Sequence, residues 1–248
     1  MLPQTYLAVL VLAFLSGITT IIGVLLALWL KKSVKGIVIG LGFSAGIMLL
    51  ISFFELIPES IGAAGVFKAV TATFFGILLV AILNFILPHT HLIKEKGKFK
   101  GSLMKTAYLV AFGLILHDFP EGFAMANSYI FSPGLGILVA LAIAIHNIPE
   151  EFSIAIPLVM TKKKSFLLKA AFLSGLAEPA GAAVGLFSVF LLPALNPLFM
   201  AFAAGAMIFV SIHELVPMAK RYKRTNLFVL GMILSAIVYA GLSGLIPH

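Results

Sequence analysis

The sequence predicts an all-α membrane protein with eight transmembrane helices. Hydrophobic residues make up 61% of the 248 residues and charged residues only 10%, whereas a soluble domain carries about 25% charged residues. Mean hydropathy is +1.15, so lipid has to be the main solvent. The chain has no cysteine, which excludes disulfides and thiolate metal sites. The net charge of +8 could suggest nucleic acid, but its distribution indicates a bilayer surface as the partner instead.

Eight runs are long enough to cross the hydrocarbon, which takes about 20 apolar residues per helix. The first run has no basic segment before it and is too long for a signal peptide, so we expect it to be a span. The predicted spans are Tyr6–Leu30, Gly36–Ile57, Val66–Pro88, Thr106–Tyr129, Leu135–Met160, Phe166–Leu192, Pro197–Met218 and Asn226–Ile246.

Basic residues occupy alternate linkers. Sixteen of the seventeen lie after spans one, three, five and seven, including the linker 89–105, and Lys68 is the exception. By the positive-inside rule these linkers are cytoplasmic, so both termini are expected outside the cell membrane. We expect residues 1–248 to form a single transport domain.

Two pairs of segments repeat. Residues 43–58 read FSAGIMLLISFFELIP and residues 202–217 read FAAGAMIFVSIHELVP. They lie on spans two and seven, which run in opposite directions, as in the inverted repeats of many transporters. Residues 117–126 read HDFPEGFAMA and residues 146–155 read HNIPEEFSIA, on spans four and five. The repeats predict a 3+2+3 arrangement in which spans 1–3 and 6–8 are inverted copies.

Eight of the nine acidic residues lie inside spans or near their ends. A charge at the bilayer centre costs about 3 kcal/mol, and half a dozen facing lipid would cost about 15–20 kcal/mol, more than the roughly 5–15 kcal/mol of a typical folded protein. Because the spans hold almost no lysine or arginine, a bound metal cation is the simplest missing partner. These acids are Glu55, Glu59, Asp118, Glu121, Glu150, Glu151, Glu178 and Glu214.

Helical spacing gathers ligands on spans four and five. His117 lies four residues before Glu121 and Asp118 three before it, so all three share one helix face. The second copy repeats this with His146, Asn147 and Glu150. Facing each other, the spans offer one site from His117, Glu121, His146 and Glu150, and a second from Asp118, Asn147 and the same glutamates. Nitrogen and carboxylate ligands without sulfur suit Zn²⁺, Fe²⁺, Mn²⁺ or Co²⁺.

Prolines accompany every acid in the spans, and each predicts a helix break. Pro120 and Pro149 cannot donate to the carbonyl one turn back, and Pro179 directly follows Glu178. Some polar residues have ordinary alternatives: His213 as a packing residue, Glu59 and Glu151 as vestibule or solvated groups. His89 and His91, in a lysine-rich loop, are expected to be solvated, and the alternative is a weak metal relay or sensor.

At HDFPEG, HNIPEE and GLAEPAGA the sequence resembles the ZIP (Zrt/Irt-like) divalent metal transporters, especially their compact prokaryotic branch. The resemblance covers essentially the whole chain. It implies a binuclear site at the midplane, with Glu55, His213 and Glu214 lining the route or an accessory site. Asp118 stands where the family commonly has Asn, and Glu151 where the motif usually ends in Gly. The implied ligands are His117, Asp118, Glu121, His146, Asn147, Glu150 and Glu178.

The resemblance implies transport of divalent ions toward the cytoplasm by sliding of one helical bundle against another, and no catalytic cofactor. Zn²⁺ is the leading substrate, with Fe²⁺, Mn²⁺ and Cd²⁺ as others. The sequence leaves open whether the protein forms a homodimer. Asp118, Glu121, Glu150 and Glu178 carry four negative charges, which two divalent ions neutralise. The alternatives are a membrane metalloenzyme and a proton-coupled cation exchanger without a transition-metal site. The only His-Glu pair, at His213, lacks the second histidine of a zinc protease.

Overall fold

Helices and short turns, with no strand, make up the residues that the structure, a computed structural model, describes. These are residues 3–30, 33–86, 103–159 and 164–247, with only the backbone described for 103–116 and 157–158. The all-α class is therefore confirmed. His89 and His91 lie outside the described residues.

Seven stretches of helix within these residues are long and apolar enough to cross a membrane, and the 29-residue helix α5 takes the position expected for the fourth span. The chain is thus a multi-pass membrane protein. The seven stretches are Pro3–Leu30, Val34–Ala64, Val66–Ile86, Pro133–Ile156, Lys164–Leu191, Pro193–Lys220 and Thr225–Leu245.

Several stretches combine shorter helices. In chain order the helices are α1 (Pro3–Leu30), α2 (Val34–Leu50), η1 (Ile51–Leu56), α3 (Ile57–Ala64), α4 (Val66–Ile86), α5 (Leu103–Phe131), α6 (Pro133–Val159), α7 (Lys164–Gly175), α8 (Ala177–Leu191), η3 (Pro193–Leu195), α9 (Asn196–Val210), η4 (Ser211–Leu215), α10 (Val216–Lys220) and α11 (Thr225–Leu245).

Two boundaries differ from the expectation. The second stretch runs on to Ala64 instead of ending at Ile57, because the helix continues through Pro58, which lies directly after the π turn η1 at the start of α3. Helix α5 begins at Leu103, inside the predicted linker 89–105. At Gly65 the chain turns into α4 with φ of 87°, a conformation that glycine adopts without steric cost.

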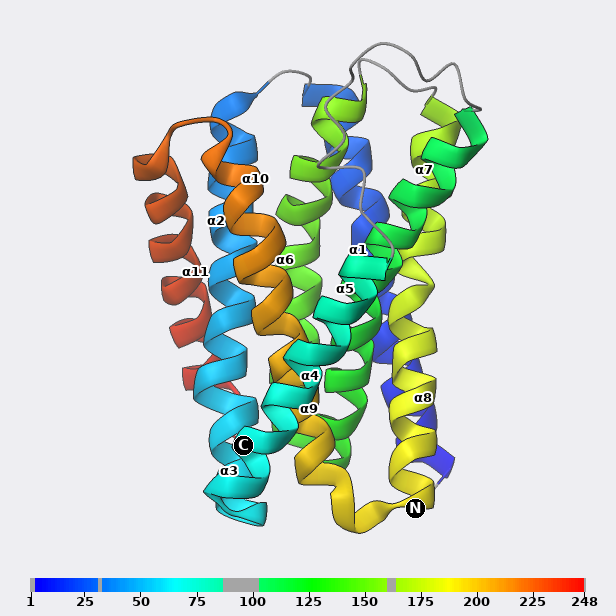
Figure 1. Cartoon of the computed structure of the whole chain (residues 1–248), viewed down its shortest axis with the longest axis vertical. Coiled ribbons are helices and arrows are strands. Elements are labelled where there is room, and N and C mark those ends of the chain that lie inside the picture. The colour runs from blue at the N-terminus through cyan, green and yellow to red at the C-terminus, as the bar shows by residue number, and fades with distance from the viewer. Residues whose placement is uncertain (1–2, 31–32, 87–102, 160–163, 248) are drawn as a thin grey trace.

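The helices pack in a paired pattern. The most extensive contacts join α1 to α6, α5 to α8, α2 to α11 and α4 to α9, and α5 and α6 also contact each other. Figure 1 shows α11 beside α2 at one edge of the bundle, and both termini at the end that holds α3 and η3. The turn between α10 and α11, with its basic residues, lies at the opposite end.

The two SxxELxP repeats have the same unusual backbone. Each forms a turn of π-helix, η1 and η4, with the proline in the first turn of the α-helix that follows. Ser52 donates to the carbonyl of Met48 (2.7 Å), and Ser211 to that of Met207 (2.8 Å). Serine hydroxyls that bond back in this way bend helices, and single π turns are frequent at functional sites.

The expected helix breaks at Pro120 and Pro149 are not found. Both α5 and α6 continue through these prolines as α-helix. Tight packing on neighbouring helices maintains them, since a proline within a span is tolerated where protein surrounds it. The sixth span, in contrast, is interrupted at Leu176, just before the turn that carries Glu178.

Candidate metal centre

The two copies of the histidine motif meet inside the bundle because α5 packs against α6. All six predicted ligands of this pair are buried, none more than 5% exposed. Three of them form a compact group: one ligand atom each from Glu121, His146 and Glu150 lies within 4.8 Å of the others. Among the described residues this is the one group of three or more such side chains with metal-like spacing.

His146 is central to this group. Its Nε2 atom lies 3.1 Å from Oε1 of Glu121 and 3.8 Å from Oε2 of Glu150. Its Nδ1 atom lies 3.0 Å from the carbonyl oxygen of Ala142, and because a carbonyl can only accept, Nδ1 must donate. The Nε2 lone pair of the neutral ring then faces a carboxylate oxygen. Two acceptors face each other, so a proton or a cation has to lie between them, and a histidine held by its other nitrogen is typical of metal ligands.

The glutamates of the group are only partly satisfied. Oε2 of Glu121 and Oε2 of Glu150 are buried and have no hydrogen-bond partner among the described residues. A buried polar atom without a partner is rare, and a bound ion or water is a common reason. The free oxygens and the histidine nitrogen together form a donor set of oxygen and nitrogen that suits zinc and similar ions.

Asn147 and Glu178 extend this group toward α8. The amide nitrogen of Asn147 donates to Oε1 of Glu178 over 2.6 Å, and Glu178 is fully buried. Gly122 packs so closely on the backbone of Glu178 that a β-carbon at 122 would clash with it. Small residues of this kind allow helices in membranes to approach closely. The α5–α8 contact thus places Glu178 next to the paired motifs.

Asp118 has a different neighbour. Its Oδ2 accepts a short hydrogen bond from the hydroxyl of Ser174 on α7. The same hydroxyl lies 3.4 Å from Oε1 of Glu151, and all three side chains are buried. Asp118 therefore lies outside the group around His146, and Glu151 faces the protein interior instead of the solvent.

His117 likewise lies outside the group. Its Nε2 is 3.2 Å from Oε2 of Glu214 on η4. The other oxygen of Glu214 is 3.4 Å from the amide nitrogen of Asn84 on α4. The first copy of the motif thus contacts the π turn η4 through His117, whereas helical spacing predicted that His117 lies beside His146.

The remaining predicted residues lie apart from this centre. Glu55, in the other π turn, is buried and accepts a short hydrogen bond from the hydroxyl of Tyr239 on α11. His213 is exposed and stacks on Phe209, with ring centroids 4.7 Å apart. Its outward position favours a packing role. Glu59 is half-buried in α3.

The sequence did not predict three residues that donate hydrogen bonds to the buried acids. Asn84 donates to Glu214, Ser174 to Asp118 and Tyr239 to Glu55. No motif marks them, because each reaches an acid from another helix. Ser174 had the strongest available signal, since it lies four residues before Glu178, about one helical turn away.

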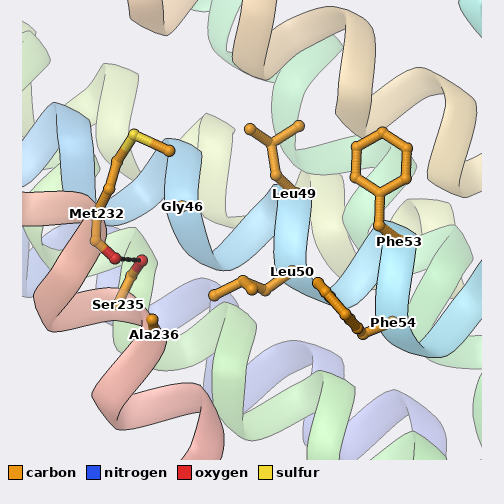
Figure 2. Close-up of a pocket in the computed structure, with 8 residues that line it drawn as sticks. All are labelled: Gly46, Leu49, Leu50, Phe53, Phe54, Met232, Ser235 and Ala236. Carbon is orange, nitrogen blue, oxygen red and sulfur yellow. Dashed lines mark hydrogen bonds between the residues drawn. The ribbon is translucent and has the colours of Figure 1, made fainter. Parts of the chain in front are cut away.

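An apolar pocket of about 230 Å³ lies elsewhere, between α2, η1 and α11. Figure 2 shows it lined by carbon-rich side chains, with the hydroxyl of Ser235 already donating to the carbonyl of Met232 over 2.7 Å. It offers no ionisable group to a cation. Its lining residues are Gly46, Leu49, Leu50, Phe53, Phe54, Met232, Ser235 and Ala236.

Comparisons with known proteins identify the family of this chain. The family model described as ZIP Zinc transporter matches residues 89–243. The protein named zinc transporter ZupT of Chlorobium limicola is 39% identical, over 96% of this chain and 97% of its own length. The ZupT zinc transporters of Streptococcus mutans and Akkermansia muciniphila are 37% and 36% identical, and the alignments cover 93% and 94% of this chain and 94% and 96% of their own lengths. The chain therefore belongs to the ZIP family.

Proposed function

We propose that this protein carries divalent transition-metal ions, Zn²⁺ foremost, across the cell membrane toward the cytoplasm. The observation that carries the proposal is the group around His146, in which a histidine lone pair faces a carboxylate oxygen 3.1 Å away. A divalent cation between Glu121, His146 and Glu150 would satisfy all three and neutralise the two carboxylates. Zinc favours such mixed nitrogen and oxygen ligands, and the relatives are named as zinc transporters.

Family membership excludes the enzyme alternative, because ZIP proteins are transporters and not enzymes. We infer that Fe²⁺, Mn²⁺ and Cd²⁺ are further substrates, since the same types of donor atom bind these ions as well. The geometry of the site and the availability of each metal then decide which ion is bound.

A second ion would complete a binuclear centre. Asn147 and Glu178, joined by a 2.6 Å hydrogen bond, lie beside the two glutamates and would bind it, and Asp118 would join them after leaving Ser174. The carboxylates of Asp118, Glu121, Glu150 and Glu178 then balance two divalent ions, and Glu151, buried beside Asp118, is a fifth acid outside this count. His117 would join the first ion after leaving Glu214. This charge balance supports two ions in preference to one, because uncompensated carboxylates are costly in a membrane interior.

We propose eight spans in a 3+2+3 arrangement, with both termini outside and residues 1–248 acting as one transport domain. The contact pattern supports an inverted repeat. In such a repeat spans one, two and three correspond to spans six, seven and eight, and span four corresponds to span five. The α1–α6 contact then corresponds to the contacts of α5 with α7 and α8, and the α2–α11 contact corresponds to the α4–α9 contact. The two π turns and their back-bonded serines correspond in the same way.

The helix pairs also support the sliding mechanism. The most extensive contacts group α1, α5, α6, α7 and α8 in one set and α2, α4, α9 and α11 in another, and the two sets touch where α2 meets α6 and where α5 meets α9. The predicted ligands lie in the first set, whereas Glu214 and Asn84 lie in the second. The His117–Glu214 pair therefore bridges the two sets, and it would have to break if one bundle slides past the other.

The test is uptake of Zn²⁺, Fe²⁺, Mn²⁺ and Cd²⁺ into proteoliposomes. We expect wild-type protein to take up Zn²⁺, and Glu121→Ala and Glu150→Ala to lose uptake strongly. Glu59→Ala is the matched control, because it removes a half-buried acid outside the centre. Unimpaired uptake in either centre variant would remove the role assigned to that residue. Proton-driven exchange without metal dependence would favour the alternative exchanger.

A further inference from the structure

The two copies of the histidine motif differ in charge at two positions. Asp118 corresponds to Asn147, and Gly122 corresponds to Glu151. Each copy therefore has one acid that the other lacks. The structure brings these two acids to the same point, the hydroxyl of Ser174 on α7.

Packing explains where each acid can lie. A side chain at Gly122 has no room, because the backbone of Glu178 closes on that position. The corresponding Glu151 has room because it faces Gly23 on α1, which has no side chain. A β-carbon at position 23 would lie only 2.7 Å from the β-carbon of Glu151. Glu151 is consequently buried, at 3% exposure, between α1, α6 and α7.

One hydroxyl serves two carboxylates here. Ser174 is fully buried and has one proton to donate. It donates to Asp118 in a short hydrogen bond and lies 3.4 Å from Glu151. Two carboxylates this close repel each other, so the serine holds Asp118 next to a like charge and away from the group around His146.

We propose that Ser174 is a positioning residue for ion selection: by holding Asp118 beside Glu151 it limits how far Asp118 contributes to the metal centre. This inference rests on the proposed transport function. Without the hydroxyl, Asp118 turns away from Glu151 and toward the divalent ion at Glu121, which lies three residues further along the same helix. The centre gains a carboxylate oxygen, which favours ions that prefer oxygen ligands, such as Mn²⁺, over Zn²⁺.

The test is the ratio of KM values for Mn²⁺ and Zn²⁺ uptake into proteoliposomes. Groups that orient metal ligands typically change metal affinity or activity by about 10–100-fold when removed. We expect Ser174→Ala to lower the Mn²⁺/Zn²⁺ ratio of KM values by about tenfold. Binding of each ion to the purified protein, measured by calorimetry, should shift in the same direction.

A double-mutant cycle separates positioning from a purely structural role. In an Asp118→Asn background, which copies the residue of the second motif, Ser174→Ala should leave the ratio unchanged because there is no carboxylate to release. The matched control is Ser128→Ala, since Ser128 is equally buried but its hydroxyl bonds only to carbonyls of its own helix.

An unchanged ratio in Ser174→Ala, or an equal shift with and without Asp118, overturns the inference. A protein that transports neither ion in its wild-type form contradicts the proposed function itself, so the two failures are distinguishable. Size-exclusion profiles matching the wild type establish that each variant is folded before its ratio is interpreted.

Discussion

The contact of α5 with α8 leaves no room for a side chain at Gly122, and this makes Gly122→Ala a sharp test of the site. A β-carbon there would clash with the carbonyl oxygen of Glu178. Backbone, unlike the end of a flexible side chain, cannot turn aside, so α8 would have to move. Because Glu178 is the point of contact, the same movement displaces its carboxylate from Asn147.

The magnitude follows from two opposing effects. Overpacking a tight interior typically costs about 1–3 kcal/mol, whereas replacing a helical glycine by alanine gains up to about 1 kcal/mol in helix propensity. Gly241→Ala on α11 is the matched control, because nothing lies within 4 Å of a β-carbon there. It receives the same gain without the clash, so the difference between the variants measures the steric cost.

The assay is thermal unfolding of both purified variants in detergent, followed by Zn²⁺ uptake. For a chain of this size 1 kcal/mol corresponds to about 2–4 °C, so the midpoint of Gly122→Ala should lie roughly 2–12 °C below that of Gly241→Ala. We also expect uptake to fall in Gly122→Ala alone. Equal midpoints with unchanged uptake would refute the close α5–α8 approach and the placement of Glu178 that depends on it.

Two further predictions concern proton competition and orientation. Zn²⁺ affinity of the purified protein should weaken between pH 7.5 and 5.5, by about tenfold per pH unit for each proton displaced, because protons compete for the carboxylates and for the ring nitrogen of His146; a flat calorimetric profile would contradict this. Because the chain has no cysteine, a single introduced cysteine can report on which side of the membrane its position lies. A membrane-impermeant maleimide should label Gly62→Cys in intact cells, but Lys220→Cys only after permeabilisation. The reverse labelling pattern would contradict the proposed orientation.

Much of the fold follows from the sequence alone. Lipid requires runs of about 20 apolar residues, so the positions of the spans are visible in the chain and agree with the helices to within a few residues at most ends. Helical spacing also places Glu121 on one face with its neighbours, and the motif repeated at His146 predicts that α5 and α6 face each other. The structure brings Glu121, His146 and Glu150 together as that spacing indicates.

The partners of the other acids depended on the tertiary structure. Spacing within one helix cannot say which helix lies opposite, nor how far a π turn rotates a side chain such as Glu214 toward His117. Likewise, Asp118 contacts Ser174 because of the way α7 packs against α5. Local sequence determines which residues share a helix face, whereas the rotation and crossing of whole helices, set by close packing at glycines, determine which faces meet.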